Sequence, residues 1–120
     1  MAHLTSRVAA LTLIALACQG AAHAADAVLN IYSARHYQTD EALYKDFTKQ
    51  TGIQVNRLDG KEDELLERIK NEGANSPADI LITVDAARLE IADSLGLFQP
   101  VSSKVLDARI PDHLRTPTWV

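Results

Sequence analysis

The hydrophobic and polar positions repeat one plan three times from Val28 onward: a short apolar run, then a longer amphipathic segment. The apolar runs predict strands at 28–32, 53–58 and 78–84, and the amphipathic segments predict helices at 40–52, 61–72 and 86–95. Strands that alternate with helices of this length indicate parallel βαβ units with right-handed crossovers. The fold class is therefore predicted to be α/β, a three-layer βαβ sheet.

The helix ends carry recognisable signals. Thr39 or Asp40 can cap the first helix, and Asp85 stands directly before the third. Gly52 and Gly73 mark the ends of the first two helices. The third strand holds Ile80–Ile82, an unbroken apolar run typical of a strand covered on both faces.

The pattern weakens after Pro100, where a short helix over 101–108 and a loop containing Pro111 and Pro117 are expected. A three-stranded parallel sheet of this size would be marginal alone. We therefore expect the chain to be part of a larger protein.

The first 24 residues have the features of an export signal. Arg7 precedes an apolar run over 8–17, and Ala22-His23-Ala24 supplies a small-x-small cleavage pattern. The run is too short to cross a bilayer, so no membrane insertion is expected. The sequence thus predicts a signal peptide at 1–24 and an exported domain at 25–120, with Cys18, its lone cysteine, removed by cleavage.

Composition argues against several functions and types of site. The formal charge is −4, and basic residues do not cluster with aromatic ones, which argues against nucleic-acid binding. Without a thiol, the exported domain would have no disulfides, no thiolate zinc site and no cysteine catalysis. The acidic residues at 62–67 are interpreted as a solvated helix face that complements the helix dipole, and Tyr32 and Tyr44 as packing residues.

Polar side chains that could bind a ligand follow the first and third strands. Open α/β sheets bind ligands beyond the carboxyl ends of their strands, where the strand order reverses. With the first strand central and the other two beside it, Arg35, His36 and Tyr37 would reach the same crevice as Asp85.

These donors suit a hard cation. Phenolate and carboxylate are anionic oxygen donors, imidazole binds iron, and tyrosine ligates iron in catalase. A phenol loses its proton at neutral pH only if the metal's charge drives it off, which favours Fe(III) over Ca²⁺ or Mg²⁺. Simpler roles remain open: Asp85 as a helix cap, His36 and Arg35 as solvated surface groups, and Tyr37 as a ring packed on the next helix.

Three segments in order, "YSARHY", "GKEDEL" and "SPADILITVDAARL", resemble the N-terminal part of the periplasmic ferric-ion-binding proteins. These are the substrate-binding components of bacterial Fe(III) ABC importers. The resemblance implies a two-lobed type II periplasmic-binding-protein fold, of which residues 25–120 would form part of the first lobe, with the second lobe absent from this chain. The family's adjacent tyrosine pair lies in that second lobe.

The resemblance also implies roles for individual residues. His36 and Tyr37 match ligands on the loop after the first strand, and Asp85 matches an acidic ligand of some members. In the tyrosine-rich branch, which "RHY" resembles more, that carboxylate need not bind iron, so the ligands rank Tyr37, His36, Asp85. Arg35 would offset the anionic donors or hold a companion anion such as carbonate.

The expected function is capture of Fe(III) in the periplasm by a monomeric binding protein that delivers it to an inner-membrane ABC permease. One alternative is the same fold binding a polyamine, thiamine or an oxyanion; in an oxyanion binder, helix N-termini would bind the ligand and Tyr37 would merely pack. Another is an exported α/β enzyme, although the sequence has no G-x-S-x-G, G-x-x-x-x-G-K-[ST] or H-E-x-x-H motif.

Overall fold

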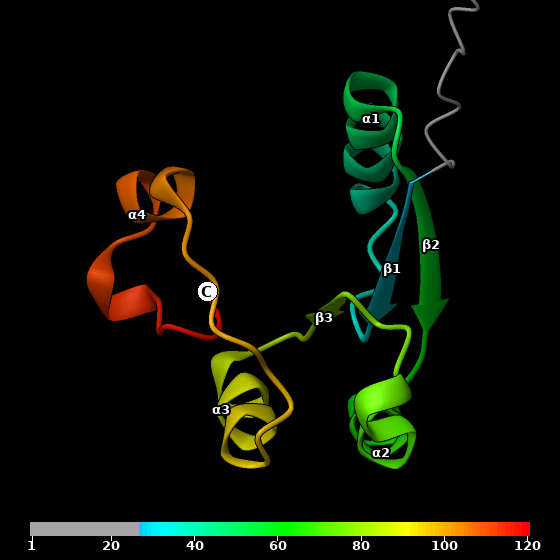
Figure 1. Ribbon diagram of the computed structural model, residues 1–120. Coiled ribbons are helices and arrows are strands. Elements are labelled where there is room, and N and C mark those ends of the chain that lie inside the picture. The colour runs from blue at the N-terminus through cyan, green and yellow to red at the C-terminus, as the bar shows by residue number, and fades with distance from the viewer. Residues whose placement is uncertain (1–26) are drawn as a thin grey trace, which may run out of the picture.

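The computed structural model describes residues 27–120, which contain a three-stranded parallel sheet with the order β2-β1-β3 (Figure 1). β1 (Val28–Ser33) is central, β2 (Gln54–Asp59) lies on one side and β3 (Ile80–Ile82) on the other. This order and the α/β class confirm the sequence prediction. The predicted signal peptide and Cys18 lie outside the described residues.

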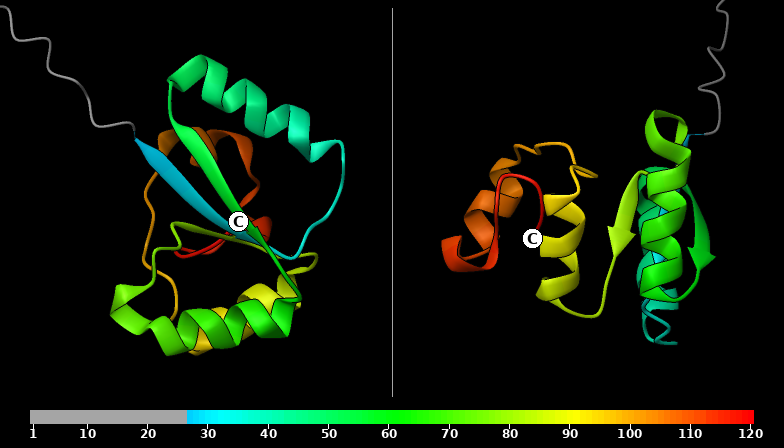
Figure 2. Two further views of the ribbon diagram at one scale, coloured as in Figure 1. Left: turned by 90° about the vertical axis from the view of Figure 1, so that its right-hand side faces the viewer. Right: turned by 90° about the horizontal axis from the view of Figure 1, so that it is seen from below.

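Two helices cover the sheet from opposite faces (Figure 2). α1 (Asp40–Thr51) connects β1 to β2, and α2 (Glu62–Glu72) connects β2 to β3. Because β2 and β3 flank β1 on opposite sides, right-handed crossovers must place the two connecting helices on opposite faces. The result is the expected three-layer arrangement.

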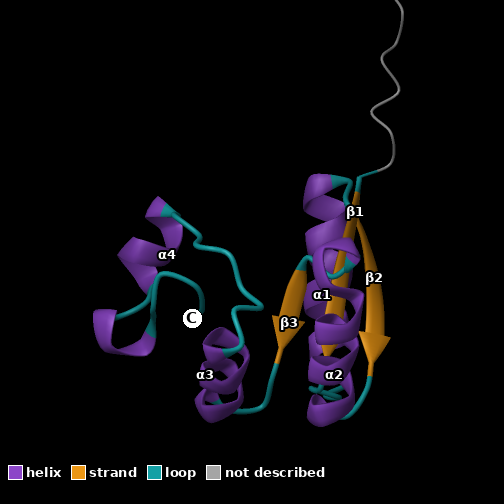
Figure 3. Ribbon diagram, turned by 60° about the horizontal axis from the view of Figure 1, so that its bottom comes forward, coloured by secondary structure: helices purple, strands orange, loops and turns teal. Residues whose placement is uncertain are grey.

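The strand register brings the carboxyl ends of all three strands to one level (Figure 3). Ser33 pairs with Asp59 of β2 and with Ile82 of β3, so the segments that follow β1, β2 and β3 leave the sheet side by side. This edge is where an open α/β sheet presents its ligand-binding loops.

β3 is shorter than the predicted span of 78–84. At its start, the Asn30 N–H donates to the Asp79 carboxylate at 2.8 Å, and at its end the Val84 N–H donates to the Glu62 carboxylate at 3.0 Å. The Asp79 side chain therefore takes a backbone donor of β1 beside the start of β3, and the Glu62 side chain takes the backbone donor of Val84 after its end. The expectation of a strand covered on both faces is wrong, since Ile80 is 42% exposed and Leu81 and Ile82 are only half-buried.

The core is small and draws on both faces of β1, because the neighbouring Ile31 and Tyr32 point to opposite sides of the sheet. The buried apolar residues of the described chain are Ile31, Tyr32, Leu65, Leu66 and Ala92. α1 contributes no buried residue, and its Leu43 is exposed. Tyr32 packs as predicted, and its hydroxyl also donates to the Glu72 carboxylate at 3.0 Å.

The helix ends follow the sequence signals in part. Gly52 ends α1 in the left-handed conformation, with φ of 75° and its N–H bonded to Thr48 O at 2.8 Å. The predicted side-chain cap of α1 is wrong: Thr39 makes no cap bond, and the Asp40 carboxylate instead binds Arg35.

Four further short elements complete the described chain: η1 (Gly73–Asn75), α3 (Ala86–Ser94), α4 (Lys104–Arg109) and η2 (Asp112–Leu114). α3 and α4 lie beyond the β3 edge (Figure 1). α4 begins later than the predicted 101–108 helix because Ser103 caps it, accepting from the Leu106 N–H. Across residues 27–120, no helix has the length and apolar character needed to cross a membrane.

Candidate functional site

The loop after β1 begins with a buried hydroxyl that sets its direction. Ser33 is fully buried, and its Oγ accepts from the Arg35 N–H at 3.1 Å and donates to the Arg35 carbonyl at 3.0 Å. One side chain thus satisfies both backbone groups of Arg35, and the chain turns away from the sheet immediately after the strand.

Backbone hydrogen bonds tie this loop to both neighbouring strand ends. The Ala34 N–H donates to Ile82 O at 2.9 Å, and the Gly60 N–H donates to Ser33 O at 3.1 Å. The start of the β1 loop is therefore fixed between the ends of β2 and β3. The prediction that the loops after β1 and β3 open at the same edge of the sheet is confirmed.

Arg35 is held by a carboxylate and lies over an aromatic ring. Its Nε is 2.7 Å from Asp40 Oδ2, and its guanidinium carbon is 4.8 Å from the centre of the Tyr37 ring. The hydrogen bond and the charge of Asp40 raise the pKa of Arg35 above its ordinary value. This guanidinium therefore places a permanent positive charge beside the phenol ring.

Tyr37 and His36 both face solvent. The Tyr37 ring is 59% exposed rather than packed under α1, and His36 is exposed as well. Among residues 27–120, neither the phenol oxygen nor the imidazole has a hydrogen-bond partner. Both donors are thus accessible to a ligand arriving at the carboxyl edge of the sheet.

Asp85 is the N-cap of α3. Its Oδ1 accepts from the Arg88 N–H at 3.0 Å, which confirms the capping role predicted from its position. Oδ2 makes no bond within the described part of the chain, so one carboxylate oxygen is unused by the cap. Its role as a ligand stays a prediction.

The acidic start of α2 has a role that the sequence interpretation missed. Glu62 accepts from the Val84 N–H at 3.0 Å and pairs with Arg88 Nε at 3.1 Å, and Asp63 binds the same guanidinium at 2.6 Å. Reading this turn as a purely solvated face was therefore wrong. The sequence did contain a signal for this pairing. Arg88 lies in the first turn of α3, where the helix dipole disfavours a cation, so an anionic partner was to be expected.

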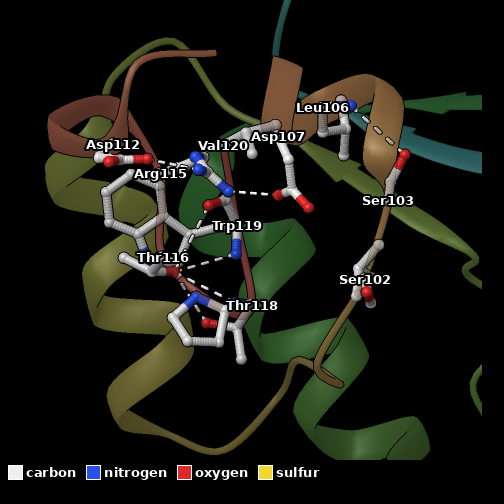
Figure 4. Close-up of a pocket in the computed structure, with 12 residues that line it drawn as sticks. Ser102, Ser103, Leu106, Asp107, Asp112, Arg115, Thr116, Thr118, Trp119 and Val120 are labelled. Carbon is white, nitrogen blue, oxygen red and sulfur yellow. Dashed lines mark hydrogen bonds and ion pairs between the residues drawn. The ribbon is translucent and has the colours of Figure 1, made fainter. Parts of the chain in front are cut away.

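No group of three or more His, Cys, Asp or Glu side chains in the described range is arranged to hold a metal ion. A separate cavity of about 490 Å³ lies in the C-terminal segment, lined by Trp119 and by Arg115, which pairs with Asp107 and Asp112 (Figure 4). None of the predicted ligands lines this cavity.

The chain is similar to iron-binding proteins of known sequence. It is 61% identical to iron uptake protein A1 of Synechocystis over 89 residues, which are 74% of this chain and 25% of the relative. It is 33% identical to the Fe(3+)-binding periplasmic protein of Serratia marcescens over 98 residues, which are 82% of this chain and 29% of the relative. No protein-family profile matches.

Solved structures agree with these relatives. The Trichodesmium protein FutA, solved in complex with iron and citrate, is 58% identical with a TM-score of 0.72, and the match covers 75% of this chain and 28% of that chain. The match confirms that the sheet and its helices are part of a type II periplasmic-binding-protein fold. The chain is thus related to the periplasmic ferric-ion-binding proteins and spans about a quarter of the length of the curated relatives it matches.

Proposed function

We propose that this chain forms one wall of a ferric-ion site in a periplasmic binding protein for iron uptake. The observation that carries the proposal is the exposed Tyr37 phenol, which stands next to His36 at the carboxyl edge of the sheet without a hydrogen-bond partner in the described residues. The relatives' names, which specify iron uptake and Fe(3+) binding, support the choice of metal.

Within this site, Tyr37 would bind Fe(III) through its phenolate oxygen and His36 through an imidazole nitrogen. Asp85 would add Oδ2 while Oδ1 continues to cap α3. Arg35 would remain beside the phenolate and offset the negative charge of the donors or of a companion anion such as carbonate.

These donors are too few to enclose the ion, so the remaining ligands would come from outside residues 27–120 or from a chelating anion. Citrate is one such anion, and the Trichodesmium relative was solved with iron and citrate. In a longer protein, a second lobe would supply the other ligands and close over the ion by a hinge motion.

The cellular role follows from the same proposal. The leader at 1–24 would direct the monomeric protein to the periplasm, where it would pass Fe(III) to an inner-membrane ABC permease. The protein would bind and release its cargo without chemical conversion, so no enzymatic activity is expected.

A ferric citrate titration followed by visible absorption tests the proposal. Coordination of Tyr37 should produce a phenolate-to-Fe(III) charge-transfer band, and Tyr37→Phe should abolish it. Tyr44→Phe is the matched control, because Tyr44 is half-buried on α1, where Arg57 stacks on its ring at 5.3 Å. A wild-type titration without a band, or a Tyr37→Phe band equal to that of the wild type, contradicts the proposal.

A further inference from the structure

We propose that residues 60–63, which form the turn between β2 and α2 and the first two residues of α2, position both loops that carry the proposed ferric ligands. The inference deepens the proposed function and rests on it for the identity of those ligands. The turn makes separate hydrogen bonds to the loop after β1 and to the loop after β3.

The first contact is made by Gly60. Its N–H donates to Ser33 O at 3.1 Å, two residues before Arg35 in the chain that leads to the ligand loop. A Cβ at position 60 would lie 3.0 Å from Leu65 Cδ2 and 3.2 Å from Leu65 Cγ, and Leu65 is buried at 3% exposure. Glycine is therefore the residue that lets the backbone lie against Leu65 and reach Ser33.

The second contact is made by Glu62, whose two carboxylate oxygens have different partners. Oε1 accepts from the Val84 N–H at 3.0 Å, and Oε2 pairs with Arg88 Nε at 3.1 Å. Val84 directly precedes Asp85, and Arg88 supplies the N–H that Asp85 caps. Glu62 thus holds the backbone just before Asp85 and the side chain of Arg88, whose N–H Asp85 caps.

The carboxylate of Glu62 is unsuited to be a ligand itself. Both oxygens are engaged, and the side chain is only 16% exposed. Glu62 is therefore a positioning residue, which acts on the site through Val84 and Arg88. Asp63 reinforces it by binding the same guanidinium at 2.6 Å.

The two contacts meet at the edge of the sheet. The Ile82 carbonyl accepts from the Ala34 N–H at 2.9 Å, so the loop that Glu62 holds is also bonded to the loop that Gly60 holds. Connected hydrogen bonds therefore link the start of α2 to the backbone segments that lead to Tyr37 and Asp85. Displacing the turn should disturb both segments together.

Amide exchange of the metal-free chain, followed by NMR, tests the positioning directly. Glu62→Ala should speed exchange of the Val84 amide about tenfold, because it removes a hydrogen bond to a charged acceptor. Glu62→Gln keeps an acceptor oxygen for Val84 and should exchange as the wild type does. Glu64→Ala is the matched control on the same helical turn, since Glu64 is 66% exposed and its side chain pairs only weakly, with Lys61 at 3.6 Å.

Unchanged exchange at Val84 in Glu62→Ala, with the Ile31 amide confirming an intact core, overturns the inference. A ferric citrate titration of the same variants then connects positioning to the site. Glu62→Ala should bind iron about five- to tenfold more weakly, and Glu62→Gln should restore most of the affinity.

Two outcomes separate this inference from the proposed function. If exchange rises in Glu62→Ala while its ferric affinity equals that of the wild type, the turn does not position the site and the inference fails. If the wild type itself binds no iron, the proposed function fails, and the exchange data alone decide whether the turn holds the loops.

Discussion

Substituting Gly60 by alanine tests the packing on which the β2–α2 turn depends, because two opposing effects can be separated there. Gly60 does not have a positive φ, so alanine is sterically allowed by its own backbone. Alanine has fewer backbone conformations than glycine in the unfolded chain, so folding loses less conformational entropy. This effect alone should stabilise the fold by about 0.4–1 kcal/mol. Any destabilisation must come from the space around the new methyl group.

That space is occupied by Leu65. The new Cβ would stand 3.0 Å from Cδ2, 3.2 Å from Cγ and 3.8 Å from Cδ1 of this side chain. Leu65 is buried on the sheet-facing side of α2 at 3% exposure, and its side chain would have to shift by a few tenths of an ångström to admit the methyl group. Overpacking of this kind costs about 1–3 kcal/mol, so we expect Gly60→Ala to lower the free energy of unfolding by about 1 kcal/mol net.

A double-mutant cycle identifies the cause. Leu65→Ala removes all three opposing atoms and should by itself cost about 2–5 kcal/mol. In that background Gly60→Ala should be neutral or stabilising, a coupling of about 1–2 kcal/mol. The four proteins are compared by urea unfolding in a stabilising osmolyte, which keeps the Leu65→Ala proteins folded at the start. Equal costs of Gly60→Ala in both backgrounds would refute the proposed contact.

Two further predictions concern carboxylates with identified partners. Asp85→Ala removes the cap on the Arg88 N–H and should lower the free energy of unfolding in urea by about 1 kcal/mol. Asp85→Asn should keep the cap but weaken ferric affinity. Equal ferric affinity in Asp85→Asn and wild type would show that Asp85 is not a ligand. The pKa of Glu72 lies below its usual 4.5, chiefly because Ser76 donates a hydrogen bond to it and Arg68 pairs with it. A lowered pKa gives stability that is present above pH 4.5 and lost as the pH falls through the lowered value, so the stability difference between wild type and Glu72→Gln should shrink below pH 4.5; a difference that stays constant with pH contradicts this assignment.

The alternation of strands and helices was predictable because each element has its own local signal. Apolar runs, Gly52 and Asp85 marked elements that the structure contains, and the common βαβ arrangement with the first strand central matched the strand order β2-β1-β3. The placement of Tyr37 at the carboxyl edge of the sheet followed from its position directly after the first strand.

The departures come from side chains that take backbone hydrogen bonds at a distance in the sequence. The ends of β3 are set by Asp79 and Glu62, the latter 22 residues before its partner Val84, and no local propensity encodes such a pairing. A nearer contact explains α1, where Asp40 pairs with the guanidinium of Arg35, five residues earlier, instead of capping the helix. These contacts depend on which elements meet in the fold.

The site was predictable to the level of residue type and location. The sequence indicated that the loops after β1 and β3 meet, but not that Ser33 and Gly60 fix the start of the β1 loop. It indicated Arg35 as a charge near the donors, whereas its stacking on the Tyr37 ring requires the three-dimensional structure.

Resonance Raman spectroscopy of the ferric complex, with excitation in the visible charge-transfer band, tests most directly whether Tyr37 coordinates iron. We expect enhanced tyrosinate ring vibrations in the wild type and in Tyr44→Phe, and their loss in Tyr37→Phe. Tyrosinate vibrations that persist unchanged in Tyr37→Phe, or that are missing from an iron-loaded wild-type protein, would contradict the account.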